Sequence, residues 1–279
     1  MREIKREDVI LKIKELVDEA CCKVDGSAFC AINKCLDKEA SSLGQQILTE
    51  IIKNDDLAKD LKKPICQDTG IVVCFVKVGR ECYLPFDLNE AINEGIKEAY
   101  LEGYYRKSVV NDPLERVNTK DNTPAIIYHE LVSGDKITIT LEPKGAGSEN
   151  MSSLKMLTPA DGINGIKQFV LDTVKEKGAK ACPPLIIGLG IGGDFEKCAM
   201  LAKEALMEDL DAPFENETYQ LLAKELKDAI NDLGIGPMGL GGSSTCLGVR
   251  IKSYPCHIAS LPVAINIQCH VSRHAKGVI

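Results

Sequence analysis

The chain has 279 residues, of which 44% are hydrophobic and 27% charged, so it can bury a sizeable core in one large domain or two smaller ones. Its 34 basic and 41 acidic side chains give a net charge of -7. This balance argues against a sequence-independent nucleic-acid-binding protein, which needs a basic surface to neutralise phosphates. No apolar run is long enough to span a membrane, and the charged, amphipathic start of the chain lacks the pattern of a signal peptide. We therefore expect a cytoplasmic protein.

The first part of the chain has the pattern of helices. Residues 3–60 are rich in Leu, Ile, Ala, Lys and Glu, with apolar positions three or four apart, and this spacing predicts two to four helices. A β-branched run bounded by glycines, residues 70–79, predicts a strand. Residues 84–109 again have helical spacing, and we expect that helix to begin near Asp87.

Two strands are expected next, at residues 123–132 and 136–143. The segment 133–135 between them, Ser-Gly-Asp, is typical of a hairpin turn, so we expect the two strands to pair directly. Residues 161–178 predict a helix that ends at Gly178 after a basic last turn.

The remaining third of the chain continues the alternation of strands and helices. An apolar run at 183–190 predicts a buried strand, two helices should follow it, and the chain closes with two strands near 245–254 and 262–271. The glycine-rich segment 234–245 is too rich in glycine for regular structure. We expect an α/β (or α+β) fold, in which a helical N-terminal segment precedes strands and helices interleaved around a mixed sheet.

The chain contains twelve cysteines, which need a chemical explanation. A secreted disulfide framework is unexpected in a chain of this length, and the absence of any C-x-x-C pair weakens the zinc-ribbon and thioredoxin-type interpretations. Cys74 and Cys198 lie inside a predicted strand and helix, where we expect them in the core. Cys66, Cys182 and Cys269 each mark a boundary between a strand and a loop, where a thiol can face a cleft and bind a metal.

Glycine-rich stretches raise two further possibilities. Gly188, Gly190 and Gly193 form a G-x-G-x-x-G motif after a strand, as in a dinucleotide-binding turn, but no acidic residue follows at the end of a second strand. An anion held at the helix start, or close packing of strand on helix, fits the sequence better than a dinucleotide site. The turns 143–152 and 239–245 either present backbone N–H groups to a carboxylate or phosphate, or are loops without a ligand.

Several long blocks of the sequence resemble one known family. They are "PICQDTG", "RKSVVNDPLERVNTKDNTPAIIYHELV", "KGAGSEN", "CPPLIIGLGIGGD", "GIGPMGLGGSST" and "YPCHIASLPVAINIQCHVSRH". In this order they resemble the N-terminal domain, or α subunit, of the iron–sulfur (class I) fumarate hydratase and L-tartrate dehydratase family. The resemblance covers essentially the whole chain. It implies a single domain, residues 1–279, that is mainly helical over 1–60 and carries the cluster site in an α/β part over 61–279.

The resemblance implies a 4Fe–4S cluster held by Cys66, Cys182 and Cys269, with one iron that no protein residue ligates. An iron with an open position acts as a Lewis acid toward a hydroxyl and a neighbouring carboxylate of a 2-hydroxy dicarboxylate, so that water leaves or adds without redox change.

Other site residues follow from the same motifs. Gln67 and Asp68 should face the substrate, with Asp68 assisting proton transfer, and Arg106 should clamp a carboxylate. Gly147 should present backbone N–H groups to the other end of the substrate, and His257 should donate a hydrogen bond. Each has a simpler alternative, such as a surface ion pair for Arg106, a cap for Asp68 and a core histidine for His257.

We expect the α subunit of a hydro-lyase that interconverts fumarate and L-malate, a reaction of the tricarboxylic acid cycle. The alternative is dehydration of L-tartrate to oxaloacetate. More distant alternatives are an NAD-dependent dehydrogenase, which would use the G-x-G-x-x-G turn, and a non-catalytic scaffold that carries a cluster or zinc. The family's second domain completes the active site and supplies the presumed catalytic base, so we expect a β-subunit partner and an α2β2 assembly.

Overall fold

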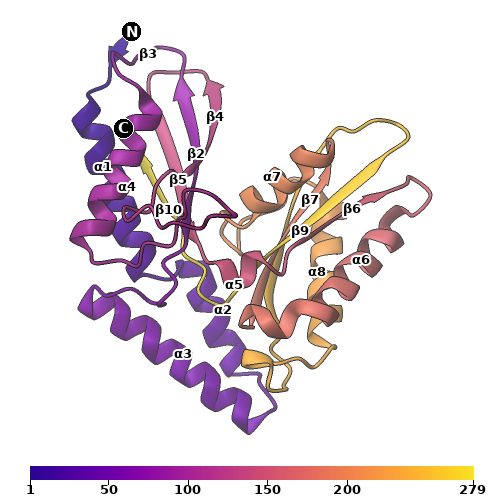
Figure 1. Cartoon of the computed structure of the whole chain (residues 1–279). Helices are drawn as coiled ribbons and strands as arrows, with labels where there is room; N and C mark the ends of the chain where they lie inside the picture. Colours follow the sequence, from indigo (N-terminus) through magenta and orange to yellow (C-terminus); the bar gives the residue numbers. More distant parts are fainter. The chain divides into compact units, whose positions relative to one another are not determined.

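The computed structural model describes residues 1–279, which form two compact units (Figure 1). The first unit consists of Met1–Asp25, Asp55–Ala146 and Arg273–Ile279, and the second consists of Gly26–Asn54 and Gly147–Ser272. None of the helices has both the length and the apolar character that a membrane crossing requires.

The first unit is built on a four-stranded sheet of order β10-β5-β2-β4. Its central strand β2 pairs antiparallel with β5 and parallel with β4, and β10 lies antiparallel at the other edge of β5. A two-residue pair, β1 with β3, is separate from this sheet. The elements are β1 (Arg2–Glu3), α1 (Arg6–Cys22), β2 (Ile71–Gly79), β3 (Cys82–Tyr83), α4 (Leu88–Glu102), β4 (Ile126–Val132), β5 (Ile137–Lys144) and β10 (Ala275–Val278).

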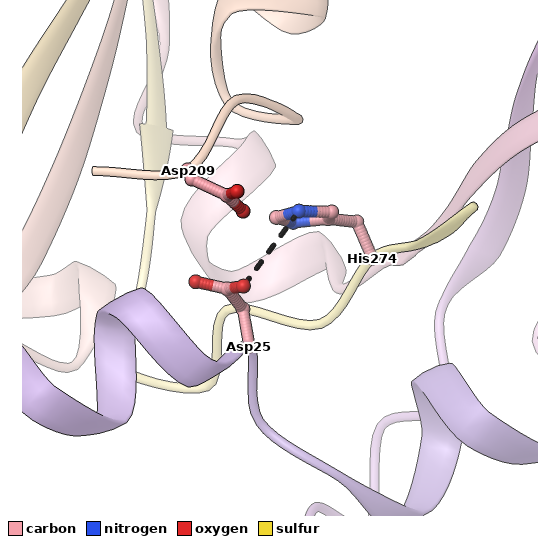
Figure 2. Close-up of side chains that lie close together, drawn as sticks. All are labelled: Asp25, Asp209 and His274. Carbon is pink, nitrogen blue, oxygen red and sulfur yellow. Dashed lines mark ion pairs between the residues drawn. The ribbon is translucent and has the colours of Figure 1, made fainter. Parts of the chain in front are cut away.

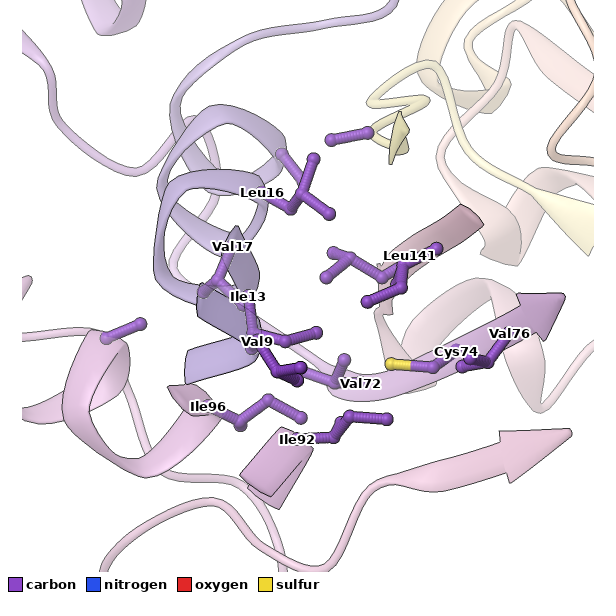
Figure 3. Close-up of a cluster of buried hydrophobic side chains, with 14 of the residues drawn as sticks. Val9, Ile13, Leu16, Val17, Val72, Cys74, Val76, Ile92, Ile96 and Leu141 are labelled. Atoms are coloured by element: carbon purple, nitrogen blue, oxygen red, sulfur yellow. The ribbon is translucent and has the colours of Figure 1, made fainter. Parts of the chain in front are cut away.

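The core of the first unit lies between this sheet and helices α1 and α4. Figure 3 shows side chains of α1, such as Val9 and Ile13, directed toward Val72 and Cys74 of β2. Their spacing follows from local geometry, because residues four apart share one helix face whereas alternate residues share one sheet face. The period of the apolar residues therefore decides which faces meet.

The second unit is built on a sheet of order β6-β9-β7-β8, in which β7 pairs parallel with β8 and antiparallel with β9. Every residue of β7 is buried, because helices cover both faces of the strand. Ile187 and Leu189 pack with α6 and α8, whereas α7 packs on the opposite face. The elements are α2 (Gly26–Leu36), α5 (Ala146–Glu149, which begins at the last residue of the first unit), β6 (Ser153–Leu157), α6 (Gly162–Lys177), β7 (Leu185–Gly192), α7 (Phe195–Ala205), α8 (Glu217–Asn231), β8 (Cys246–Tyr254) and β9 (Leu261–Gln268). The boundary between the units falls within α3 (Ser42–Leu61).

Two glycines of the G-x-G-x-x-G motif have a packing role in the structure. A Cβ atom on Gly188 would overlap with the carbonyl oxygen of Ala202, and one on Gly190 would overlap with that of Cys198, so α7 packs directly on the backbone of β7. The N-terminus of α7 is capped by Asp194, whose carboxylate accepts the N–H of Lys197 at 2.9 Å. The motif thus serves close packing of the strand on the helix. The N-terminus of α7 is already occupied by the carboxylate of Asp194.

The predicted α/β class is confirmed, and both four-stranded sheets are mixed. The strand predicted over 70–79 is β2, and α4 begins after an N-cap at Asp87 as expected, although it ends at Glu102 instead of 109. Three helices, α1, α2 and α3, occupy most of residues 6–61. This number agrees with the two to four helices predicted for residues 3–60.

The predicted hairpin between the strands at 123–132 and 136–143 is wrong. Both strands exist, as β4 and β5, but each pairs with β2, which lies between them. The Ser-Gly-Asp segment marks the end of one strand and the start of the next, but a local turn signal cannot show whether a third strand enters between them. The short strands β1, β3, β6 and β10 were not predicted.

We expect Gly190→Ala to destabilise the protein by about 1–3 kcal/mol, because the added methyl group overpacks the contact between β7 and α7. Thermal unfolding of the metal-free chain measures the change. Gly26→Ala is the matched control, since a Cβ atom there meets nothing within 4 Å. Equal unfolding temperatures for Gly190→Ala and wild type would contradict the packing role.

Candidate functional site

The first group of predicted site residues lies in the turn between α3 and β2. Asp68 shapes this turn: its Oδ1 accepts the N–H of Gly70 at 3.0 Å and its Oδ2 accepts the N–H of Ala146 at 2.9 Å. The N–H of Asp68 in turn donates to the Sγ of Cys66 at 3.4 Å. Gly70 has φ of 70°, and a Cβ atom there would lie 2.6 Å from the carbonyl oxygen of Lys144. The turn therefore fixes a partly exposed thiol beside a carboxylate.

Arg106 is held against the same turn through its backbone. The hydroxyl of Thr69 donates to the carbonyl oxygen of Arg106 at 2.7 Å, and the hydroxyl of Tyr100 donates to the carbonyl oxygen of Thr69 at 2.5 Å. The Arg106 side chain is exposed and forms no ion pair, so the alternative of a surface ion pair does not apply. Cys66, Asp68 and Arg106 thus lie within one small region of the first unit.

Arg273 is a residue of this region to which the sequence assigned no role. It is buried, with 3% of its surface exposed; its Nε donates to the carbonyl oxygen of Pro143 at 2.9 Å and its Nη2 donates to that of Asp68. Arg273 therefore ties the turn to the end of β5. The neighbouring His274 lies 3.9 Å from a carboxylate oxygen of Asp25 (Figure 2).

The second group of predicted site residues lies at the edge of the second unit's sheet at which β7 begins and β9 ends. Because β7 and β9 are antiparallel, with Ile186 opposite Gln268, the residues before β7 and after β9 meet at the same edge. Cys182 precedes β7 and Cys269 directly follows β9. His270 joins them: its backbone N–H and its Nδ1–H donate to the carbonyl oxygen of Cys182 at 3.4 and 3.0 Å. Two of the three predicted ligands are therefore neighbours.

The backbone of Cys182 is strained. Its φ of 56° and ψ of 65° are left-handed, a conformation that costs a non-glycine residue about 1–3 kcal/mol and persists only where neighbours enforce it. Burial lowers the pKa of His270, although its hydrogen bond to Cys182 acts in the opposite direction, so the ring favours its neutral form. A neutral ring with its proton on Nδ1 keeps Nε2 as an acceptor.

The segment that contains Gly147 lies beside the end of β9. Glu149 Oε2 and Ser152 Oγ accept from the side-chain amide of Asn266 at 2.9 and 3.0 Å, and Ser152 Oγ also accepts the N–H of Ile267 at 3.1 Å. A Cβ atom on Gly147 would meet nothing within 4 Å. The backbone at Gly147 is therefore open to an approaching molecule. It belongs to a segment that contacts the part of β9 directly before Cys269.

His257 lies at the opposite edge of the same sheet, at which β8 ends and β9 begins. It belongs to the loop between β8 and β9, and β9 places its two ends about 23 Å apart at about 3.3 Å per residue. The structure therefore does not bring His257 together with Cys182 and Cys269 of the same chain. The ring is exposed, which excludes a core histidine, and its Nδ1 accepts the N–H of Ala259 at 3.1 Å. In the neutral ring the proton is thus on Nε2, where it can be donated.

The loop of His257 borders an apolar groove of about 520 Å³ in the second unit. Ile163, Ile166 and Leu222 line this groove, and Ile258, next to His257, is 91% exposed. Such an exposed apolar surface beside an ordered polar loop is a feature of contact surfaces.

The glycine-rich turn 239–245 is not an open anion site, because a carboxylate of the chain occupies it. Glu39 accepts the backbone N–H groups of Ser243 and Ser244 at 2.8 to 3.1 Å. Burial alone would raise the pKa of Glu39, but these bonds and that from Ser41 lower it below its ordinary value. Its stabilising contribution is therefore present above that ordinary value and lost as the pH falls through the lowered pKa.

The remaining cysteines separate into buried and exposed thiols. Cys74 and Cys198 are fully buried, which confirms their predicted place in the core. Burial raises the pKa of Cys74 to about 12, and it raises the pKa of Cys246 to about 12 as well. Since the thiolate is the metal ligand, such thiols are poor candidates. Cys66, Cys182 and Cys269 are partly or fully exposed at loop ends, and this donor set suits an iron–sulfur cluster.

An α/β protein with partly or fully exposed thiols near the ends of its strands, an open glycine backbone and an exposed arginine without an ion pair has the features of a metal-dependent enzyme. A family model described as fumarate hydratase (Fumerase) matches residues 10–278. A Methanocaldococcus jannaschii protein, provisionally named L(+)-tartrate dehydratase subunit alpha, is 43% identical over 279 residues, which cover 98% of this chain and 96% of the relative. The L(+)-tartrate dehydratase subunits alpha of Escherichia coli O157:H7 and Shigella sonnei are each 32% identical over 247 residues, 87% of this chain and 80% of the relative.

The chain belongs to the fumarate hydratase (Fumerase) family, as the resemblance of its sequence blocks indicated. It is therefore part of a hydro-lyase. The relatives are named for L(+)-tartrate, which is the substrate of the alternative expectation, whereas the family model is named for fumarate, the substrate of the first choice.

Proposed function

We propose that this chain is the α subunit of an iron–sulfur hydro-lyase that removes water from L-tartrate to give oxaloacetate. The observation that carries the proposal is that the exposed thiol of Cys182 and the partly exposed thiol of Cys269 belong to one sheet edge of a chain from a hydro-lyase family. Fumarate and L-malate are the second candidate pair, because the family model is described as fumarate hydratase and the substrates differ by one hydroxyl.

In this proposal Cys66, Cys182 and Cys269 hold one 4Fe–4S cluster. When bound, the cluster supplies an iron without a protein ligand that acts as a Lewis acid toward a hydroxyl and a carboxylate. The twelve free cysteines suit a reducing compartment, and we propose the cytoplasm.

The side chains of the first unit would bind and orient the substrate. The exposed guanidinium of Arg106 can take a substrate carboxylate in two parallel hydrogen bonds, since it has no partner in the chain. Gln67 is exposed next to Cys66 and can donate its side-chain amide to a substrate oxygen. Asp68, held by two backbone N–H groups, would accept or return a proton at a carboxylate oxygen. The backbone N–H at Gly147 would bind the other carboxylate.

The assembly would contain two copies of this chain and two copies of a β subunit. The relatives are named as subunit alpha, and in this proposal the β subunit supplies the catalytic base and further basic residues. His257 cannot reach the edge of Cys182 and Cys269 in its own chain. We therefore propose that it donates Nε2–H to substrate bound at that edge of the second copy.

Anaerobic reconstitution with iron and sulfide tests the cluster. We expect about four iron and four sulfide per chain, as a 4Fe–4S cluster requires, and a loss of both in Cys66→Ser, Cys182→Ser and Cys269→Ser. Alkylation with iodoacetamide and mass spectrometry should show protection of these three thiols after reconstitution. Cys30 is an exposed internal control and should stay reactive. Equal metal content in wild type and the three variants would exclude the ligand assignment.

Arg106→Lys should raise the KM for L-tartrate by about tenfold or more, because an ammonium cannot form the paired hydrogen bonds of a guanidinium. The unfolding temperature should not change, since the side chain has no partner to lose. Steady-state kinetics of the α and β subunits expressed together give the KM, with L-malate and fumarate as competing substrates. Arg116→Lys, an exposed arginine of the same segment, is the control. An unchanged KM in Arg106→Lys would remove the clamp role.

A complementation experiment tests whether His257 acts in the second copy. His257→Asn and Cys182→Ser should each be nearly inactive. An assembly that contains one chain of each kind, isolated with two affinity tags, should recover about half of the wild-type activity, because one of its two sites combines an intact Cys182 with an intact His257. If His257 served its own chain, both sites would carry one defect and the mixed assembly would stay inactive. Full activity of His257→Asn alone would show that the histidine is not part of the site.

A further inference from the structure

Glu39 is a buried acid that links two distant parts of the second unit. It lies between α2 and α3, is 3% exposed, and uses both carboxylate oxygens as acceptors. Oε1 accepts the N–H groups of Ser41 and Ser243 at 3.0 and 2.9 Å, and Oε2 accepts those of Ser243 and Ser244 at 3.1 and 2.8 Å. Bonds from N–H groups to a charged carboxylate are stronger than those to a neutral acceptor, so Glu39 stabilises one conformation of the turn.

The turn is shaped to receive this carboxylate. Gly242 has φ of 134°, and a Cβ atom there would lie 2.6 Å from Glu39 Oε1. Gly44 lies on the other side, where a Cβ atom would lie 2.8 Å from Glu39 Cγ. Both positions therefore need glycine for Glu39 to enter, which indicates that the contact is a built feature of the unit.

The same turn contacts the segment that carries Cys182. The N–H of Met238 donates to the carbonyl oxygen of Pro183 at 2.8 Å, and the N–H of Leu185 donates to that of Thr245 at 2.7 Å. Pro183 and Leu185, which follow Cys182, are thus hydrogen-bonded to residues 238–245. Glu39 binds the C-terminal part of this turn.

The left-handed conformation of Cys182 must be enforced from its surroundings. His270 holds the carbonyl oxygen of Cys182 itself, and the turn holds Pro183 and Leu185, the first and third residues after the cysteine. Without the turn, the segment could relax to an extended conformation, which would redirect the thiol.

We propose that Glu39 is a positioning residue for Cys182, acting through the 238–245 turn to hold this cysteine in its left-handed conformation. The proposal rests on the proposed function insofar as Cys182 is a cluster ligand. Glu39 itself touches neither the substrate nor the cluster.

Hydrogen exchange of the metal-free protein tests the coupling without the cluster. In Glu39→Gln one acceptor oxygen becomes an amide donor that faces the N–H groups of the turn. We expect exchange to accelerate by about tenfold at residues 182–187 and 238–245, as the loss of a charge-assisted hydrogen bond implies, with no change in the loop 255–260 at the other edge. Glu50→Gln, an exposed partner of Lys53, is the charge-matched control. Unchanged exchange at 182–187 overturns the proposal.

Iron release from the reconstituted protein tests the consequence for the site. Glu39→Gln should release iron to a chelator about tenfold faster than wild type, by the same loss of one charged hydrogen bond. Val170→Ala removes core volume in α6 and serves as a variant of comparable thermal destabilisation. If both variants release iron equally fast, Glu39 has only a structural role and the proposal fails. If the wild-type protein binds no cluster, the proposed function fails, and the exchange experiment still decides the coupling.

Discussion

The antiparallel register between β7 and β9 is the constraint on which the second unit depends. Pairing Ile186 with Gln268 brings the start of one strand next to the end of the other, so Cys182 and Cys269, which are 87 positions apart, become neighbours through His270. A shift of one residue would turn every side chain of β9 to the other face. The buried faces against α6, α7 and α8 exclude such a shift, so core packing sets the geometry of the edge.

The same register limits which residues can share a site. A strand is stiff and rises by a fixed length per residue, so the loop before β9 and the residue after it stay far apart. His257 and Cys269 are close in sequence, yet the strand between them acts as a spacer. A site that needs groups from both edges of this sheet requires two copies of the chain, and an exposed loop with Ile258 at its tip is suited to such a contact.

Glycine-rich segments that look alike in sequence have different roles in the structure. At Gly188 and Gly190 the missing side chain lets a helix pack on a strand. At Gly242 it admits the carboxylate of Glu39, whereas at Gly147 the backbone is open. A glycine-rich composition indicates only that some group packs closely against the backbone of the segment. Whether a helix, an internal acid or a substrate approaches it depends on elements distant in the chain.

The sequence by itself determined most elements, because helical and strand periods, the cap at Asp87 and the end of α6 at Gly178 are local features. Its motifs also identified the family and the candidate ligands. Only the tertiary structure decided that β2 separates β4 from β5, that His257 lies apart from Cys182, and that Glu39 bonds to Ser243, 204 positions away. These are pairings between distant segments, and they depend on how whole faces pack, which no local pattern encodes.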